Sequence, residues 1–249
     1  MENNENNEDN NNKDNINTYD ISKYKIDEVK KGEDISDYVE VTYKVLIIGD
    51  PFVGKSSLIQ NLVSENESAK KDYKATIGFD IFNYSAHVND VVITMQIWDT
   101  CGNIDFSCCT PNLYKNASLA ILVYEIDKRE TFDNLENWNN LLKMNSSSET
   151  IVFIVGNKSD LEREISKEKG EKYTKDFDFK YFIETSALNK INVRELFNKA
   201  LVELYEVYKY YKTEEDEEEP RINFTRRKDT FILEKKKSIR KKNLCCSIY

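Results

Sequence analysis

Residues 43–57 read YKVLIIGDPFVGKSS, an apolar run that stops at Gly49 and resumes as a helical pattern after Gly54. The run predicts a buried strand, and the residues after it predict a tight loop and the start of a helix. The spacing satisfies GxxxxGK[ST], in which glycines let backbone N–H groups approach phosphate oxygens. We therefore predict a loop that binds a nucleoside triphosphate with Mg²⁺; a chance match in a glycine-containing turn is the alternative.

The residue types in this loop divide the work of holding a charged ligand. Lys55 places a cation near the outer phosphates, and Ser56 offers a hydroxyl group to Mg²⁺. Because the glycines bring the backbone close, every residue of the loop is a candidate contact. The candidate nucleotide-binding residues are Gly49, Asp50, Pro51, Phe52, Val53, Gly54, Lys55, Ser56 and Ser57.

Composition limits the class of protein. Of the 249 residues 33% are charged, and no apolar run approaches the roughly 18 residues that cross a bilayer, so we expect no transmembrane segment. The five cysteines form no CxxC pair and the first residues show no basic-then-apolar leader, which predicts reduced thiols in the cytosol. The net charge of −9 disfavours nucleic acid as a partner.

Three compositional regions divide the chain. Residues 1–40 open with an Asn- and Glu-rich tract that has little to bury, which predicts a disordered extension. Residues 41–211 alternate strand-like runs with helical patterns, which predicts one α/β domain with a mostly parallel sheet and helices on both faces. Residues 212–249 run from acidic to basic, as is typical of a solvated tail, and end near two adjacent cysteines.

Strands are expected at six places in the central region. Asn89 and Asp90 separate the second from the third and predict a hairpin, hence one antiparallel pair at the edge of the sheet. Apolar residues at helical spacing predict helices over 131–144 and 193–208. The expected strands are 43–49, 79–88, 91–98, 118–126, 151–156 and 179–184.

A second motif, Asn157-Lys158-Ser159-Asp160, comes directly after one of these strands. The Asp160 carboxylate can accept hydrogen bonds from the ring N–H and the exocyclic amine of guanine, a pair of donors that adenine lacks. Asn157 can bond the base and tie neighbouring loops together, while the stem of Lys158 covers the purine face. The two motifs together favour GTP or GDP as the ligand; an Asn and an Asp in an exposed turn is the alternative.

Shorter pieces of sequence complete the predicted site. Asp99-Thr-Cys-Gly102 places a carboxylate near Mg²⁺ and a glycine N–H near the third phosphate, and Thr76 can offer the metal a second hydroxyl group. After the last predicted strand, the N–H of Ala187 can donate to the guanine carbonyl. The residues expected at the metal are Ser56, Thr76 and Asp99, and those expected at the base also include Ser186, Ala187 and Leu188.

These motifs, in this order, resemble those of a Ras-superfamily small GTPase, and among its branches most closely a Rab. The resemblance covers about residues 41–211, and the Rab leaning rests on TIGFDI, QIWDT and the terminal Cys-Cys. The matching stretches are GDxxVGKSS at 49–57, TIGFDI at 76–81, MQIWDT at 95–100, LVYEID at 122–127, NKSD at 157–160 and ETSAL at 184–188.

The resemblance implies a nucleotide switch of six strands and five helices that hydrolyses GTP to GDP and regulates vesicle traffic. Its two mobile loops, here about 66–78 and 101–116, would be ordered by the third phosphate and would bind effectors, an exchange factor and an activating protein. The residues expected to serve hydrolysis are Lys55, Thr76, Gly102 and Asn103.

Three residues depart from the family pattern in ways that bear on hydrolysis. Asn103 stands where a glutamine usually orients the attacking water, and its side chain is one methylene shorter. Pro51, which offers no N–H, and Phe52, which adds bulk, stand where the family usually has small residues. We expect slow intrinsic hydrolysis; the alternative is ordinary turnover, since the resemblance implies an activating protein that brings its own glutamine and arginine.

The end of the chain predicts a membrane anchor. Cys245 and Cys246 lie among the last five residues, behind ten basic residues in 221–242. In similar Rab tails both cysteines carry prenyl groups, and two chains suffice for stable anchoring where one does not. The basic segment would add attraction to an anionic cytoplasmic leaflet. We expect the protein in the cytosol and on the cytoplasmic face of an intracellular membrane; an unmodified tail is the alternative.

Two rival functions remain open on the sequence alone. A scaffold of the same fold would hold guanine nucleotide without cycling, and Asn103, Pro51 and Phe52 favour it. A phosphotransferase from another nucleotide-binding family is the second rival, and Asn157 with Asp160 argues against it.

Overall fold

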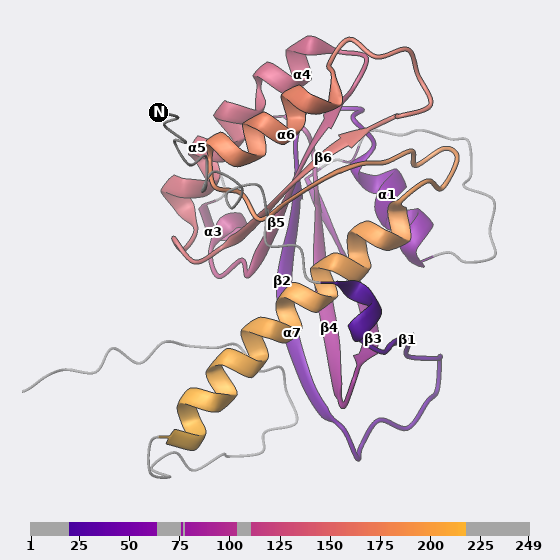
Figure 1. The fold of residues 1–249 in the computed structure, drawn as a ribbon, viewed down its shortest axis with the longest axis vertical. Helices are drawn as coiled ribbons and strands as arrows, with labels where there is room; N and C mark the ends of the chain where they lie inside the picture. The colour runs from indigo at the N-terminus through magenta and orange to yellow at the C-terminus, as the bar shows by residue number, and fades with distance from the viewer. Residues whose placement is uncertain (1–19, 64–75, 77, 104–110, 218–249) are drawn as a thin grey trace, which may run out of the picture.

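The computed structural model describes residues 20–63, 76, 78–103 and 111–217. This part of the chain forms one seven-stranded sheet in the order β1-β3-β4-β2-β5-β6-β7, with helices on both faces (Figure 1). Its strands are β1 (Ile26–Glu28), β2 (Val39–Ile48), β3 (Phe79–Val88), β4 (Val91–Thr100), β5 (Leu119–Glu125), β6 (Ile151–Asn157) and β7 (Tyr181–Glu184).

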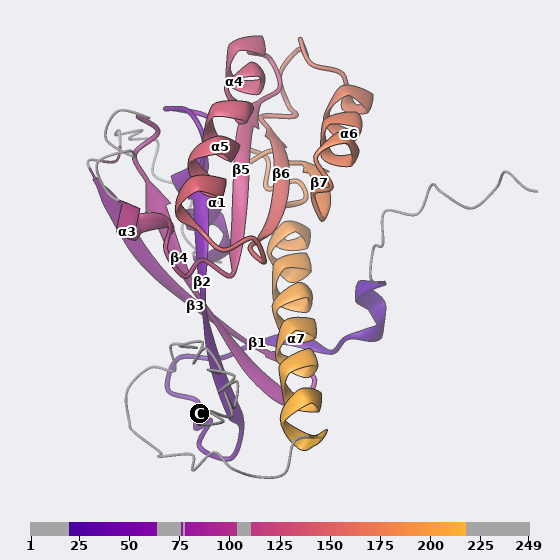
Figure 2. The same ribbon diagram turned by 90° about the vertical axis from the view of Figure 1, so that its left-hand side faces the viewer.

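The helices divide between the two faces of the sheet (Figures 1 and 2). One apolar core lies under α1 (Lys55–Val63) and α7 (Val193–Glu217). The other lies under four helices, and a short 3₁₀ helix, η1 (Ile21–Lys23), precedes the sheet. The four helices are α3 (Pro111–Tyr114), α4 (Arg129–Asp133), α5 (Leu135–Asn145) and α6 (Lys167–Asp176).

The central strands are apolar on both sides because each side faces a layer of helices. In β2, Val45 and Ile47 belong to the core under α1 and α7, whereas Leu46 and Ile48 belong to the opposite core. Every residue of β5 is buried. This two-sided burial explains why these strands read as continuous apolar runs in the sequence.

The parallel strands place the functional loops at one edge of the sheet. β2 pairs in parallel with β4 and β5, and β6 pairs in parallel with β5 and β7. The loops that come after these five strands therefore leave from the same edge. In open α/β sheets ligands bind at this carboxyl edge.

Most of the predicted elements are confirmed. β3 has the predicted bounds, 79–88, and pairs with β4 as an antiparallel hairpin. Asn89 in its turn has φ 56°, a left-handed conformation that asparagine tolerates. The helix predicted over 131–144 is interrupted at Asn134, between α4 and α5.

The sheet has one strand more than the six predicted, because the expectation of disorder for 1–40 is wrong for its described part. β1 pairs antiparallel with β3, so the predicted hairpin is not the edge of the sheet. Contacts that hold the segment include the packing of Ile26 against the core under α7 and a hydrogen bond from the Tyr24 hydroxyl to Glu206 Oε1 at 2.9 Å. The segment therefore has apolar surface to bury, unlike the Asn-rich tract before it.

Some predictions lie outside the described residues. These are the character of residues 1–19, most of the loop 66–78, the part 104–110 of the second loop, and the tail 218–249 with both terminal cysteines. Within the described part, no helix combines the length and the apolar character that a membrane span needs.

Candidate functional site

The loop 49–54 joins β2 to α1 at the carboxyl edge of the sheet. Gly49 has φ 143° and Gly54 has φ 98°, both in the region that favours glycine. A Cβ atom on Gly49 would lie 2.1 Å from the carbonyl oxygen of Val123 in β5. The loop can therefore pass this close to the sheet only because the sequence has glycine there.

Lys55 begins α1 and its ammonium group lies inside the loop. Its Nζ donates to the carbonyl oxygens of Gly49 at 2.9 Å and Asp50 at 2.8 Å. Burial lowers the pKa of Lys55 to about 8, with partial compensation from the negative charges of Asp99 and Asp50. A buried cation encircled by backbone is what a phosphate-binding loop needs.

The three residues expected at the metal lie together. Ser56 Oγ lies 3.0 Å from Thr76 Oγ1, which donates to Asp99 Oδ2 at 3.5 Å. Burial raises the pKa of Asp99, opposed by the hydrogen bond with Ser56 and the charge of Lys55. Asp99 Oδ1 is buried and has no hydrogen-bond partner within the described part of the chain. Hydroxyl and carboxylate oxygens around an unpaired buried oxygen fit Mg²⁺, which keeps waters and phosphate oxygens as its other ligands.

Gly102 lies directly against the phosphate loop. A Cβ atom on it would lie 2.2 Å from the Pro51 nitrogen and 2.5 Å from the Asp50 carbonyl oxygen. No side chain fits this position without displacing backbone. Asn103 is exposed, and its N–H donates to the Cys101 carbonyl oxygen at 2.7 Å.

The two unusual loop residues differ in their surroundings. Pro51 sits beside Gly102 and has no N–H to offer a ligand there. Phe52 has φ 65° and is 67% exposed, so its ring adds apolar surface to the outside of the loop. Ser57 lies half-buried in the first turn of α1.

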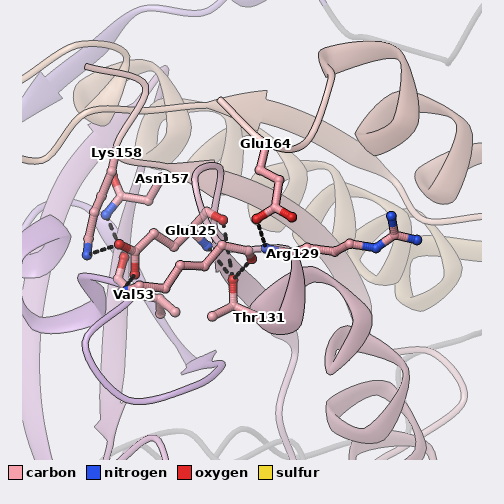
Figure 3. A network of polar contacts seen from close by, with 8 residues as sticks. Val53, Glu125, Arg129, Thr131, Asn157, Lys158 and Glu164 are labelled. Atoms are coloured by element: carbon pink, nitrogen blue, oxygen red, sulfur yellow. Dashed lines mark hydrogen bonds and ion pairs between the residues drawn. The ribbon is translucent and has the colours of Figure 1, made fainter. Parts of the chain in front are cut away.

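Asn157 ties the phosphate loop to the loop after β7. Its Nδ2 donates to the Val53 carbonyl oxygen at 2.7 Å (Figure 3). Its Oδ1 accepts from Thr185 Oγ1 at 3.0 Å and from the Ala187 N–H at 3.2 Å. The sequence predicted this linking role for Asn157, whereas it assigned the Ala187 N–H to the guanine carbonyl.

Asp160 lies shortly after β6 and is exposed. The Ser186 hydroxyl donates to Asp160 Oδ1, so the loop after β7 reaches the carboxylate expected to bind the base. Leu188, expected near the base, is 67% exposed. Asp160, Ser186 and the Asn157 amide therefore lie at adjacent strand ends, as the motif order predicts.

Lys158 has a partner that the sequence reasoning missed. Its Nζ lies 2.6 Å from Oε1 of Glu125, the last residue of β5 (Figure 3). The Nζ of Lys128 lies 3.1 Å from the other carboxylate oxygen, Oε2. Lys158 has φ 65°, a strained conformation for a lysine. The signal was the carboxylate in LVYEID at the end of a buried strand, a position where an unpaired charge is costly.

Asp50 is also paired across the fold, and this too was missed. Its carboxylate accepts from Trp138 Nε1 and from Asn134 Nδ2, each at 2.7 Å. Trp138 lies within 131–144, where the spacing of apolar residues predicted a helix. Its indole N–H was the available signal, because a buried donor of this kind needs an acceptor.

The geometry divides the site into two ends. The phosphate end comprises residues 49–56 with Thr76, Asp99 and Gly102. The base end comprises residues 157–160 with Ser186 and Ala187. Cys245 and Cys246 lie outside the described residues, so lipidation stays a prediction.

Comparisons with known proteins agree with this arrangement. A family model described as Ras family matches residues 44–206. "Ras-related protein RABA6a" of Arabidopsis thaliana is 39% identical over 177 residues, which cover 70% of this chain and 73% of that protein. "Ras-related protein Rab-11C" of Dictyostelium discoideum is 38% identical over 168 residues, which cover 67% and 74%. "Ras-related protein YPTC6" of Chlamydomonas reinhardtii is 34% identical over 221 residues, which cover 87% and 99%. The chain therefore belongs to the Ras family and is a Rab-like small GTPase.

Proposed function

We propose that this protein is a switch that binds GTP, hydrolyses it to GDP, and regulates vesicle traffic at an intracellular membrane. One observation carries the proposal: at the same edge of the sheet, the Asp160 carboxylate lies at one end of the site and the buried Lys55 ammonium at the other. A molecule with guanine at one end and phosphates at the other matches both.

The base end supplies the selectivity for guanine. Asp160 Oδ1 already accepts from Ser186, which holds the carboxylate in place for the ring N–H and exocyclic amine of guanine. Adenine would offer this carboxylate neither the ring N–H nor the matching amine, so Asp160 would lose both hydrogen bonds from the base, at a cost of about 1–3 kcal/mol.

The phosphate end supplies charge stabilisation. The Lys55 ammonium and the backbone N–H groups of the loop would hold the outer phosphates, with Pro51 contributing none. Ser56, Thr76 and Asp99 would hold Mg²⁺, which when bound neutralises charge on the phosphates. The Gly102 N–H would lie near the third phosphate, since its backbone touches the loop.

The rate of hydrolysis depends on how the attacking water is held. The exposed Asn103 comes after Gly102 in the position of a water-orienting amide, but its side chain is short. We expect intrinsic hydrolysis slowed by about ten- to thousandfold relative to a glutamine, which corresponds to roughly 1–4 kcal/mol of barrier. A scaffold that binds guanine nucleotide without hydrolysing it is the second candidate, favoured by Asn103 and by Pro51 beside Gly102.

Nucleotide content and single-turnover kinetics test this function. The full-length protein, denatured after purification, should release GDP or GTP and no adenine nucleotide. Release of phosphate from preloaded GTP is then compared between wild type and Asn103→Gln. A faster Asn103→Gln supports the slow switch. Equal nonzero rates remove the role given to Asn103, and phosphate release from neither variant favours the scaffold.

The partners and the membrane anchor complete the proposal. Residues 66–78 and 101–116 would bind effectors, an exchange factor and an activating protein when a third phosphate is present; the described residues Thr76, Gly102 and Asn103 of these loops belong to the phosphate end. Cys245 and Cys246 would carry prenyl groups that hold the protein on a cytoplasmic leaflet. Intact mass of protein from native cells should show two prenyl additions, and replacing both cysteines by serine should leave the protein in the cytosol.

A further inference from the structure

We propose that Glu125 is a positioning residue: it fixes Lys158 against the purine ring and thereby sets how slowly guanine nucleotide leaves. This inference rests on the proposed function, because it gives Lys158 a task only if a purine binds beside it.

The sheet register brings the two residues together. Glu125 ends β5 and pairs with Asn157, which ends β6, in the parallel ladder. Lys158 is the next residue, and its Nζ lies 2.6 Å from Glu125 Oε1. The Glu125 side chain is 3% exposed, whereas that of Lys158 is 29% exposed. The carboxylate is therefore the buried anchor and the lysine the partner that reaches toward the site.

A lysine that is ordered before the nucleotide binds makes binding less costly in conformational entropy. A lysine side chain loses rotamer freedom when it is ordered, and this loss opposes binding. If the ammonium is already held by Glu125, that loss occurs on folding and is not repeated when nucleotide binds. The methylene stem between backbone and ammonium is then available as an apolar surface for a purine ring.

The surroundings of Glu125 favour its charged form. Burial alone would raise its pKa, but hydrogen bonds from Lys158 and Lys128 outweigh burial and hold the pKa of Glu125 below its usual value. The Glu125 N–H donates to Thr131 Oγ1 at 3.0 Å, which fixes the backbone. In Figure 3 the side chain of Arg129 points away from this carboxylate, and the backbone N–H of Arg129 donates to Glu164 Oε2 at 2.9 Å.

The decisive variant is Glu125→Gln, which keeps the size of the side chain and removes its charge. We expect it to release bound GDP about tenfold faster than wild type, because a difference of 1.4 kcal/mol corresponds to a factor of ten. Release is measured on the full-length protein, preloaded with a fluorescent GDP analogue and chased with excess GDP in the presence of Mg²⁺.

Two further variants separate positioning from general destabilisation. Glu203→Gln is a matched control. Glu203 on α7 is also a buried carboxylate, 8% exposed, and it pairs with Lys180 at 3.4 Å. Lys180 directly precedes β7, so this pair lies at the amino end of that strand, away from the nucleotide site. Glu203→Gln should leave the release rate unchanged. Lys158→Met keeps the stem and removes the ammonium group, and in this background Glu125→Gln should cause no further acceleration.

Each outcome decides the matter. The inference is supported if Glu125→Gln releases GDP faster than wild type and if the double variant releases GDP no faster than Lys158→Met alone. A wild-type rate in Glu125→Gln overturns it, as does an equal acceleration in Glu203→Gln or an undiminished effect without the Lys158 ammonium. Failure of the wild-type protein to retain guanine nucleotide would instead overturn the proposed function, before Glu125 is tested.

Discussion

The base end and the phosphate end of the site are held in different ways. At the base end, Asn157, Lys158 and Asp160 each already have a protein partner. Within the described part of the chain, the Lys55 ammonium donates hydrogen bonds only to carbonyl oxygens at the phosphate end, and Asp99 Oδ1 has no hydrogen-bond partner. Thus the side chains of the base end are held in place before a ligand binds. The phosphate end instead has buried charged groups that need a ligand or a metal ion as their partner.

The largest effect should come from removing the cation of the phosphate end. Lys55→Met keeps a stem of similar length and loses the charge, so we expect affinity for GDP to fall about 100- to 1000-fold, because a charged pair made in a dry site contributes about 3–4 kcal/mol. Isothermal titration of GDP into nucleotide-free protein measures this. A loss below tenfold would mean that the backbone of the loop holds the phosphates without Lys55.

A smaller loss with a changed preference should appear at the base end. Asp160→Asn replaces an acceptor by a donor, so we expect GDP affinity to fall about ten- to hundredfold, with a cost of about 1–3 kcal/mol for a mismatched polar contact. Xanthosine diphosphate, which has a carbonyl in place of the exocyclic amine, should bind the variant better than wild type. Competition between the two nucleotides checks this, and an unchanged preference would place the base elsewhere.

The affinity for GDP should depend on pH through the phosphate end of the site. The pKa of Lys55 is about 8 in the ligand-free protein because of burial, and bound phosphates would raise it. Binding then requires proton uptake above pH 8, so affinity for GDP is full below that pH and falls as pH rises, by about tenfold at pH 9. Lys55→Met measured at pH 7 and 9 is the control, and an equal decline in both proteins would assign the dependence to another group.

The smallest effect should come from removing one hydrogen bond that holds the phosphate loop, the bond from Trp138 to Asp50. Trp138→Phe keeps the aromatic packing and removes the indole N–H that donates to Asp50. A hydrogen bond to a charged group contributes about 1.5–3 kcal/mol. Because Asn134 still donates to Asp50, we expect only part of this loss to reach the nucleotide and GDP to leave about fivefold faster. Trp98→Phe is the matched control, because the Trp98 indole donates to Gln96 and not to the loop. Equal release from both variants would make the Asp50 contact structural only.

Local sequence pattern predicted the strands and the loops that carry the site. Apolar runs flanked by glycine or asparagine fixed most strand positions, and the bounds of β3 agree with the prediction. The linking role of Asn157 was also predicted from its motif. These features depend on residues close together in the chain, for which spacing is informative.

The missed features all join residues that are far apart in the sequence. The pair of Glu125 with Lys158 depends on the register of β5 with β6, and that of Asp50 with Trp138 on how α5 packs beside the loop. β1 was missed because the disorder expected from the Asn-rich tract at the start of the chain was also assigned to the residues after it, which include this short strand. Composition averages over such a stretch and hides a strand of three residues.

The pairing of β1 with β3 determines how much of the chain a shortened protein should keep. Ile26 lies opposite Val88 and Glu28 opposite Ala86, so trimming the chain to begin at residue 41 would leave these outer backbone groups of β3 uncovered. Uncovered strand edges promote association between molecules. A trimmed protein should therefore dimerise or precipitate at lower concentrations than the full chain, even though every residue of the nucleotide site is present.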